Sequence, residues 1–314
     1  MKKNNNLYID DFVGITNRLE ALPLAFAIQK KYGHRIILDW PELKDALSID
    51  GTERGKTWLK ARWNSKRLRD CSLEDFMSLE GKNVICRSLE GPDEYLSPIY
   101  AEVAKKVKIK TKIAKAIEDT FEPYSERPVV GVHIRQGDFQ VMDENLYDPL
   151  AWEYPAVPLW WYAGVMEAIA DKYPNVHFFL SCTGDPETYK ELFERFNVFT
   201  LNQKNTYKKH EGNNSTFHPV TDLFALACCS TVLATPISGY SHWACNALGP
   251  KAEVYLPRGG ATKLDLKIGK VDLYHQRLTK WRDAIRKDLW IKPVDNLISP
   301  TAPDISWIKG ITVD

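Results

Sequence analysis

Three polar side chains gather at the end of an apolar run in the segment Arg127–Phe139, RPVVGVHIRQGDF. The run VVGVHI predicts a buried strand, and His133, Arg135 and Asp138 lie at or just beyond its end. Open α/β sheets bind their ligands beyond the carboxyl ends of the strands. Arg135 carries a planar set of donors suited to a phosphate, and an ion pair with Asp138 that closes the loop is an equally good interpretation.

A second polar cluster follows another predicted strand, in LATPISGYSHWA (Leu233–Ala244). The strand ends in a tight turn, and a helix begins near Ser241. Backbone N–H groups at a helix N-terminus favour an anion, and Ser238 and Ser241 add hydroxyl groups beside Gly239. Together with Arg135, this turn predicts a diphosphate-binding site.

A third strand end has a simpler interpretation. In LSCTGDPETY (Leu180–Tyr189) the pair Asp185-Pro186 is typical of a helix start. We therefore expect Asp185 to be an N-cap, with the proline in the first turn of the helix.

Other nucleotide-binding motifs are weak or missing. GTERGKT (Gly51–Thr57) resembles a P-loop but has three residues between its glycines where the signature has four, so we expect a surface turn. No GxGxxG occurs, which argues against an ordinary NAD or FAD fingerprint. No Asp-x-Asp occurs either, which disfavours a sugar-nucleotide enzyme that holds Mn²⁺ through that motif. A site made of an arginine and a helix N-terminus needs no metal, and we expect neither a metal nor a cofactor.

The overall composition is that of a globular protein with a substantial core. The 314 residues are 44% hydrophobic and 26% charged, with a formal net charge of +1. This length favours two mid-sized domains, and the charge balance argues against nucleic acid or an anionic membrane as a partner. The six cysteines form no CxxC pair, and neither a leader-like nor a membrane-length apolar run is present. These features predict a cytoplasmic protein with reduced cysteines and no membrane span.

Helix-length and strand-length segments alternate along the chain, which predicts Rossmann-like parallel sheets. In Gly14–Trp40, apolar residues at helical spacing precede a stop at Gly33 and the strand RIILDW. Pro23 either kinks this helix or marks its first turn. We predict an N-terminal Rossmann-like domain over 1–124, a nucleotide-sugar-binding one over 125–272, and a C-terminal helix and tail over 273–314 that packs on the first. Two such domains would face each other across a cleft. Within 125–272 the predicted strands are 129–134, 176–181, 198–200, 231–235 and 253–257, and the predicted helices are 160–172, 187–196, 222–229 and 241–248.

These residues resemble a known family. GVHIRQGDF is similar to the His-x-Arg-Arg-x-Asp motif of the α1,2-, α1,6- and protein O-fucosyltransferases, most like the bacterial nodulation type. VGITNRLEALPLAFAIQKKYGHRIILDW resembles the family's N-terminal block, FFLSCTGDPETYKELFERF its second motif, and TDLFALACCSTVLATPISGYSHWACNALG its third. The blocks occur in the family's order over much of Val13–Gly249. The resemblance implies a GT-B α/β fold with the acceptor side in the first domain.

The resemblance also implies roles for individual residues. Arg135 would hold the β-phosphate of GDP-fucose, while His133 and Asp222 would line the guanine pocket. The residues that would complete the donor site are Ser238, Gly239, Ser241, Asn17 and Arg18. Fucose would pass, with inversion and without a metal, to a hydroxyl of a glycan or glycoconjugate.

The general base is open among three carboxylates. In the α1,6 enzymes a glutamate lies about ten residues after the motif histidine, which here falls near Asp143 and Glu144, and Asp138 is the third candidate. The second arginine of the family motif is Gln136 here. Trp152, Trp160 and Trp161 make a sugar platform conceivable, with a core role favoured for at least one of them.

Three further interpretations compete with the leading one. The chain could use another nucleotide sugar on the same fold. It could be a P-loop-like NTPase or kinase, which the spacing of GTERGKT disfavours. It could also be a nucleotide- or sugar-binding protein that lacks a working base.

Overall fold

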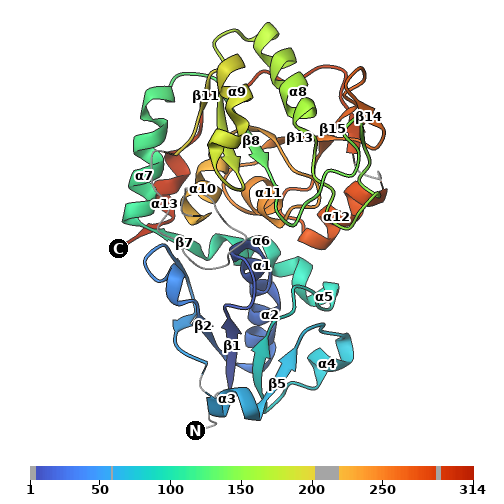
Figure 1. Cartoon of the computed structure of the whole chain (residues 1–314). Helices are drawn as coiled ribbons and strands as arrows, with labels where there is room; N and C mark the ends of the chain where they lie inside the picture. The colour runs from blue at the N-terminus through green and yellow to red at the C-terminus, as the bar shows by residue number, and fades with distance from the viewer. Residues whose placement is uncertain (1–4, 58, 202–218, 288–290) are drawn as a thin grey trace. The chain divides into compact units, whose positions relative to one another are not determined.

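The computed structural model describes residues 5–57, 59–201, 219–287 and 291–314 (Figure 1). By its internal contacts the chain forms two compact units. The first contains the residues up to Lys110 with 275–279 and Val313, and the second contains 111–274, 280–312 and Asp314.

These units differ from the boundaries expected from the sequence, which lay at residues 124 and 272. Helix α7 (Thr111–Phe121) belongs to the second unit because it packs against α10 (Pro219–Leu226). Most of the C-terminal segment also groups with the second unit rather than the first. There Arg282 donates to the carbonyl of Ile237, and the ring of Trp307 stacks on Phe224.

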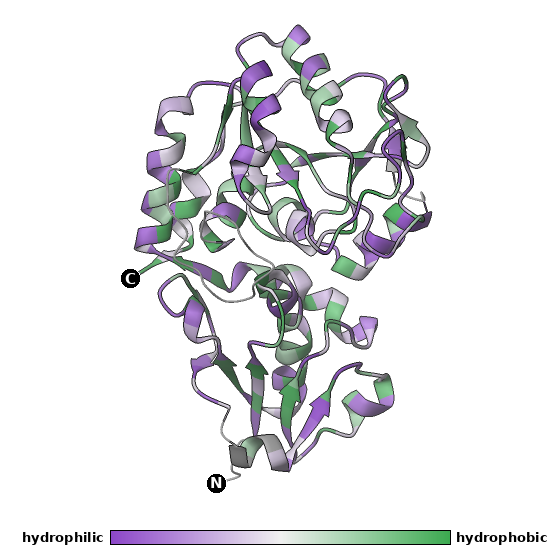
Figure 2. Cartoon of the chain, in the orientation of Figure 1, coloured by the Kyte–Doolittle hydropathy of each residue, from purple (hydrophilic) through white to green (hydrophobic). Residues whose placement is uncertain are grey.

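The first unit is an α/β unit around a five-stranded parallel sheet with the order β4-β2-β1-β6-β5. Its strands are β1 (Asn6–Asp10), β2 (Arg35–Asp39), β3 (Leu47–Ile49), β4 (Glu53–Arg54), β5 (Ser65–Leu68), β6 (Asn83–Cys86) and β7 (Val107–Lys110). Its helices are α1 (Ile15–Glu20), α2 (Leu22–Tyr32), η1 (Pro41–Leu43), α3 (Leu59–Asn64), α4 (Leu73–Met77), α5 (Asp93–Leu96), η2 (Ser97–Ile99) and α6 (Tyr100–Lys105). Figure 2 shows the central strands β1 and β6 as mostly hydrophobic and the edge strand β5 as hydrophilic, as expected when the middle of a parallel sheet is covered on both faces.

The first two helices explain the proline in the helical pattern. Helix α1 ends at Glu20, and α2 restarts at Leu22 with Pro23 in its first turn, where a missing N–H costs no helical hydrogen bond. Gly33 ends α2 with a φ of 73°, and its N–H donates to the carbonyl of Gln29. Both predicted features are confirmed, and the interpretation of Pro23 as a first-turn residue is the correct one.

The segment that resembles a P-loop is not one continuous loop. Gly51 and Gly55 lie on either side of β4, which pairs in parallel with β2. Arg54 turns back and donates to the main-chain carbonyls of Trp40 and Leu47. The expected surface turn is therefore partly an edge strand of the sheet.

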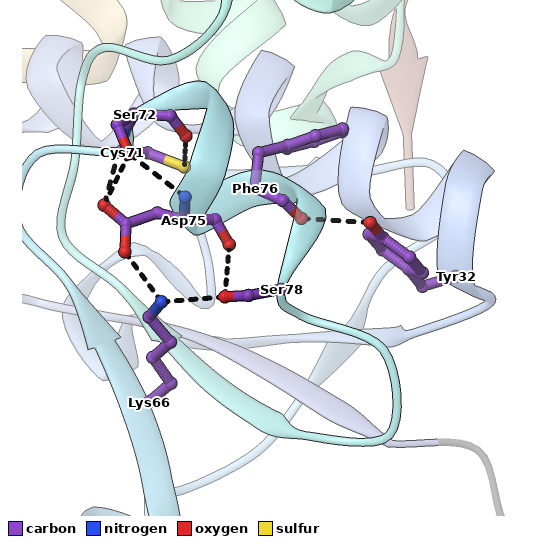
Figure 3. Close-up of polar contacts among 7 residues, drawn as sticks. All are labelled: Tyr32, Lys66, Cys71, Ser72, Asp75, Phe76 and Ser78. Atoms are coloured by element: carbon purple, nitrogen blue, oxygen red, sulfur yellow. Dashed lines mark hydrogen bonds and ion pairs between the residues drawn. The ribbon is translucent and has the colours of Figure 1, made fainter.

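A short helix of the first unit shows how its surface polar groups are satisfied (Figure 3). Ser72 caps α4, because its hydroxyl accepts from the N–H of Asp75 at 3.0 Å while the Asp75 carboxylate accepts from the Ser72 N–H at 3.4 Å. Lys66 pairs with the same carboxylate at 2.7 Å, and Tyr32 of α2 donates to the carbonyl of Phe76. These contacts hold α4 in place, and we assign a structural role to this group of residues.

The second unit is built on a seven-stranded sheet with the order β11-β10-β8-β12-β13-β15-β16. The first five strands in this order pair in parallel. Strand β15 pairs antiparallel with β13, and β16 pairs antiparallel with β15. The remaining strands of the chain are β8 (Val129–Ile134), β9 (Leu146–Tyr147), β10 (His177–Cys182), β11 (Val198–Phe199), β12 (Thr231–Leu233), β13 (Glu253–Pro257), β14 (Ala261–Thr262), β15 (Ile268–Val271), β16 (Ile291–Pro293) and β17 (Thr312–Val313), of which β17 ends in Val313 of the first unit. The remaining helices are η3 (Glu122–Tyr124), α8 (Leu159–Lys172), η4 (Pro186–Tyr189), α9 (Lys190–Arg195), α11 (Gly239–His242), the π-helix η5 (Trp243–Ala247), α12 (Leu278–Lys287) and α13 (Ser306–Gly310). The predicted parallel pairing is confirmed.

The two faces of β8 pack against different helices. Val130, Val132 and Ile134 point into a core with α8. On the opposite face, Gly131 lies against Leu226 of α10. Because side chains alternate along a strand, His133 is on the α10 face as well.

Within the described residues, no helix is both long and apolar enough to cross a membrane.

Candidate active site

The candidate site lies at the carboxyl ends of β8, β10 and β12, which are neighbours in the second sheet. In the parallel register, His133 of β8 is the partner of Ser181 of β10. Their side chains therefore share one face, and α10 covers that face. This is why residues from three separate sequence blocks meet here.

Thr235, just beyond β12, ties the ends of β12 and β8 together. Its hydroxyl donates to the carbonyl of His133 at 2.8 Å and accepts from the N–H of Arg135 at 3.0 Å. Tyr162 of α8 lies 3.0 Å from the same threonine oxygen and also donates to the His133 carbonyl. Thr235 and Tyr162 are fully buried, so the backbone around the predicted site residues is held rigidly.

His133 is buried and its imidazole is held on two sides. Its Nδ1 lies 2.7 Å from the hydroxyl oxygen of Ser241, and its ring stacks on Tyr240 with the centroids 4.9 Å apart. Burial, and then the positive charge of Arg135, lower the pKa of His133 to about 3. At neutral pH the side chain is therefore uncharged.

Asp222 of α10 is a buried carboxyl group with one oxygen engaged. Its Oδ2 accepts from Ser181 at 2.5 Å and from the Tyr240 hydroxyl at 3.4 Å. Its Oδ1 is buried without a hydrogen-bond partner among the described residues. Burial raises the pKa of Asp222 to about 7, although the hydrogen bonds from Ser181 and Tyr240 oppose this.

Arg135 follows β8 and lies closer to solvent. Its guanidinium pairs with Asp138 at 2.7 Å and lies over the ring of Phe139. The Arg135 side chain is 27% exposed and that of Asp138 is 56% exposed. Of the two interpretations of this segment, the loop-closing ion pair is present. An exposed pair of this kind is worth about 0.2–1 kcal/mol, so a more highly charged ligand can displace it.

The turn after β12 contains a non-glycine residue with a left-handed backbone. The residue with a left-handed backbone is Ile237, at a φ of 65°, which is unusual for a β-branched side chain. Ser238 caps α11 by accepting from the N–H groups of Tyr240 and Ser241. Ser241 is fully buried, with its hydroxyl on His133, whereas the sequence suggested that it faces a phosphate. The predicted helix is here a four-residue α-helix that continues as η5.

The candidate bases lie on the exposed loop between β8 and α8. Asp143 accepts from the N–H of Asn145, and the carbonyl of Glu144 accepts from the indole of Trp160. Both acidic residues are exposed, as is Asp138. Trp161 is fully buried, which confirms a core role for one of the tryptophans, and Trp152 is 50% exposed.

Asn17 and Arg18 lie in α1, which belongs to the first unit. Asn17 is half-buried, and its carbonyl accepts from the N–H of Ala21. The guanidinium of Arg18 pairs with Glu42 at 2.6 Å and lies over the ring of Trp40. Their predicted part in donor binding stays a prediction.

Four residues of this network were not assigned to the site from the sequence: Tyr240, Ser181, Thr235 and Tyr162. Tyr240 lies between two serines that were assigned, Ser181 is the last residue but one of β10, and Thr235 lies just beyond β12, so position near a strand end was the available signal. Tyr162 carries no such signal, because it lies inside an apolar helix. Asp185 is confirmed as an N-cap that accepts from the N–H of Glu187. No group of three or more His, Cys, Asp or Glu side chains in the described ranges is placed to hold a metal ion.

The two α/β units, each with a parallel sheet, place the chain in the GT-B-type fold class of solved fucosyltransferases. Over 81% of this chain and 96% of the other, the structure is similar to fucosyltransferase NodZ from Bradyrhizobium, with a TM-score of 0.51 at 17% identity. It is similar to Arabidopsis thaliana FUT1, a mutant in complex with GDP, over 85% of this chain and 74% of the other, with a TM-score of 0.55 at 11% identity. It is also similar to POFUT1 in complex with GDP-fucose over 82% and 98% of the two chains, with a TM-score of 0.50 at 10% identity. No family model and no curated protein matches the sequence.

Proposed function

We propose that this protein is a glycosyltransferase that moves fucose from GDP-fucose to a hydroxyl of a glycan or glycoconjugate. The observation that carries the proposal is the buried Oδ1 of Asp222, which lacks a partner among the described residues beside the neutral His133. A buried carboxylate oxygen without a donor is costly, and a ligand with N–H groups removes that cost. Guanine offers two such donors, at N1 and N2. The solved structures of FUT1 and POFUT1 contain GDP and GDP-fucose, respectively, which supports this choice.

The diphosphate would bind at Arg135 and at the turn that leads into α11. The arginine supplies a planar, permanently charged donor set, and the N–H of Gly239 and the capping Ser238 lie at the start of the helix. These groups can stabilise the charge that grows on GDP as it leaves, which lowers the barrier. A metal is not required for this, and we propose a metal-independent reaction.

Transfer would invert the configuration at the anomeric carbon. The acceptor oxygen attacks that carbon from the face opposite GDP, the bond to the β-phosphate oxygen breaks, and GDP leaves with the electron pair. The hydroxyl proton passes to a carboxylate. Asp143, Glu144 and Asp138 are the three candidates, and the exposure of all three leaves them accessible to an acceptor.

Two other functions fit the same site. Another nucleotide sugar could be the donor, because Gln136 stands where the fucosyltransferase motif has a second arginine. A non-catalytic nucleotide- or sugar-binding protein would need Asp222 and Arg135 and no base.

A donor screen tests the proposal. The protein is incubated in EDTA with GDP-fucose, GDP-mannose or UDP-glucose and a panel of oligosaccharides, and the products are identified by mass spectrometry. We expect deoxyhexose addition from GDP-fucose alone, and its loss in Arg135→Ala. Product from another donor would replace fucose, and GDP binding with no product from any donor would favour the binding protein.

The variants Asp143→Asn, Glu144→Gln and Asp138→Asn then identify the base. The change that abolishes transfer while GDP affinity is retained marks the catalytic carboxylate. If transfer survives all three changes, the base is elsewhere.

A further inference from the structure

The hydroxyl of Ser241 lies between two nitrogen atoms and has one proton to donate. Its oxygen accepts from the N–H of Thr235 at 3.0 Å and lies 2.7 Å from Nδ1 of His133. Ser241 is fully buried. Within the described part of the chain, the acceptor in reach of the serine proton is Nδ1. A ring proton on Nδ1 would leave the serine proton without an acceptor in a buried place, which is costly.

We propose that Thr235 and Ser241 are positioning residues that hold His133 as the neutral tautomer with its proton on Nε2. The N–H of Thr235 donates to the serine oxygen and fixes its position. The serine hydroxyl then donates a hydrogen bond to Nδ1, which carries no proton, and Nε2 is left as an N–H donor. Burial lowers the pKa of His133 and keeps the ring neutral.

The orientation of the ring is fixed by contacts that do not involve its nitrogens. Tyr240 stacks on the imidazole with an angle of 23° between the ring planes. Thr235 and Tyr162 both donate to the main-chain carbonyl of His133. The hydrogen bonds from Thr235 to Ser241 and from Ser241 to His133 therefore determine which ring nitrogen is protonated. The stacked ring of Tyr240 determines the plane in which Nε2 donates.

This arrangement gives His133 a defined chemical role. The identity of its ligand rests on the proposed nucleotide site, whereas the tautomer rests on the protein contacts alone. A neutral Nε2–H pairs with a ligand atom that accepts, such as the carbonyl oxygen or N7 of a purine. It adds no positive charge beside the diphosphate, so Arg135 carries that task. Beside Asp222, whose Oδ1 accepts, the site presents one donor and one acceptor to the same ligand.

Nitrogen-15 NMR of histidine-labelled protein tests the tautomer without any ligand. His133→Gln assigns the signal among the seven histidines. We expect Nδ1 of the wild type to resonate as an unprotonated nitrogen and Nε2 as a protonated one, unchanged from pH 8 to about pH 5, because the pKa lies near 3. A proton on Nδ1, or a doubly protonated ring at pH 6, would overturn the proposal.

Two variants separate positioning from packing. Ser241→Ala should release the tautomer preference and weaken GDP binding about tenfold, whereas Ser241→Thr keeps the hydroxyl and should restore both. An unchanged tautomer in a folded Ser241→Ala protein would overturn the role of Ser241. If the wild type shows the expected tautomer and GDP does not bind, the positioning role is supported and the nucleotide site is the part that fails.

Discussion

At Arg135, a neighbouring carboxylate and the proposed diphosphate compete for one guanidinium. The pair with Asp138 is exposed and worth about 0.2–1 kcal/mol, while hydrogen bonds to a charged group contribute about 1.5–3 kcal/mol. We therefore expect Arg135→Ala to weaken GDP binding about ten- to a hundredfold in isothermal titration. Asp138→Asn is the matched control, and it should leave GDP affinity unchanged or strengthen it by up to about fivefold. Weaker binding in Asp138→Asn would mean that the ion pair organises the site.

At Asp222, burial makes ionisation unfavourable in the folded protein. The folded pKa of about 7 lies above the value of about 3.9 in an unfolded chain, so the folded state holds more protons between these values. The stability from the protonated form is fully present below about pH 4 and is lost as pH rises through about 7. Asp222→Asn carries no such charge, so its stability relative to wild type should be highest at pH 8 and fall toward pH 4 in urea unfolding.

The pH dependence of His133 has the opposite direction and serves as the comparison. Its pKa is lowered by burial, so its contribution is present above about pH 6.5 and is lost as pH falls. His133→Gln should therefore gain stability relative to wild type on acidification. A difference between Asp222→Asn and wild type that does not change with pH would contradict a buried, titrating carboxyl group at Asp222.

At the scale of elements, the approach of α10 to β8 depends on a glycine. A Cβ on Gly131 would lie 2.7 Å from the buried Leu226 methyl and 3.1 Å from the Cβ of Cys229. We expect Gly131→Ala to cost about 1–3 kcal/mol in urea unfolding and to weaken GDP binding, because α10 carries Asp222. Gly310→Ala, where a Cβ meets nothing within 4 Å, is the control and should change little. A neutral Gly131→Ala would show that α10 has room to move.

The elements follow closely from sequence patterns, because strands and helices of this fold are local. The predicted strand 129–134 has the expected bounds, and Gly33 and Asp185 end and begin helices as expected. The helix expected at 222–229 begins earlier, at Pro219. In the turn after β12, Ile237 has a left-handed backbone. A β-branched residue rarely adopts this conformation, so the sequence did not indicate it.

The candidate site is less predictable than the elements because its contacts join distant segments. Ser181, Asp222 and Tyr240 meet only after β10, α10 and α11 pack together. Polarity at strand ends indicated where the candidate site lies. It did not indicate which hydroxyl groups serve other protein groups, and the buried hydroxyl of Ser241 is the example.

For the whole molecule, charge offers little long-range attraction to an anionic donor. Lys and Arg number 42 and Asp and Glu 41, so no strong overall field steers GDP toward the site. We expect the GDP association rate in stopped-flow experiments to change less than about tenfold between low and high salt. A steeper dependence would reveal a local basic funnel around the site.

The most direct test of the proposed donor site is a thermal-shift titration of the wild type with GDP, UDP and ADP in EDTA. A ligand that binds only the folded state stabilises it by about 2.7 kcal/mol at a hundred times its Kd. The account predicts that GDP raises the unfolding midpoint while UDP and ADP at the same concentrations do not, because Asp222 pairs with the adjacent N1–H and N2–H donors of guanine, a pair that uracil and adenine lack. Equal shifts with all three nucleotides, or no shift with GDP, would contradict a guanine-specific site and with it GDP-fucose as the donor.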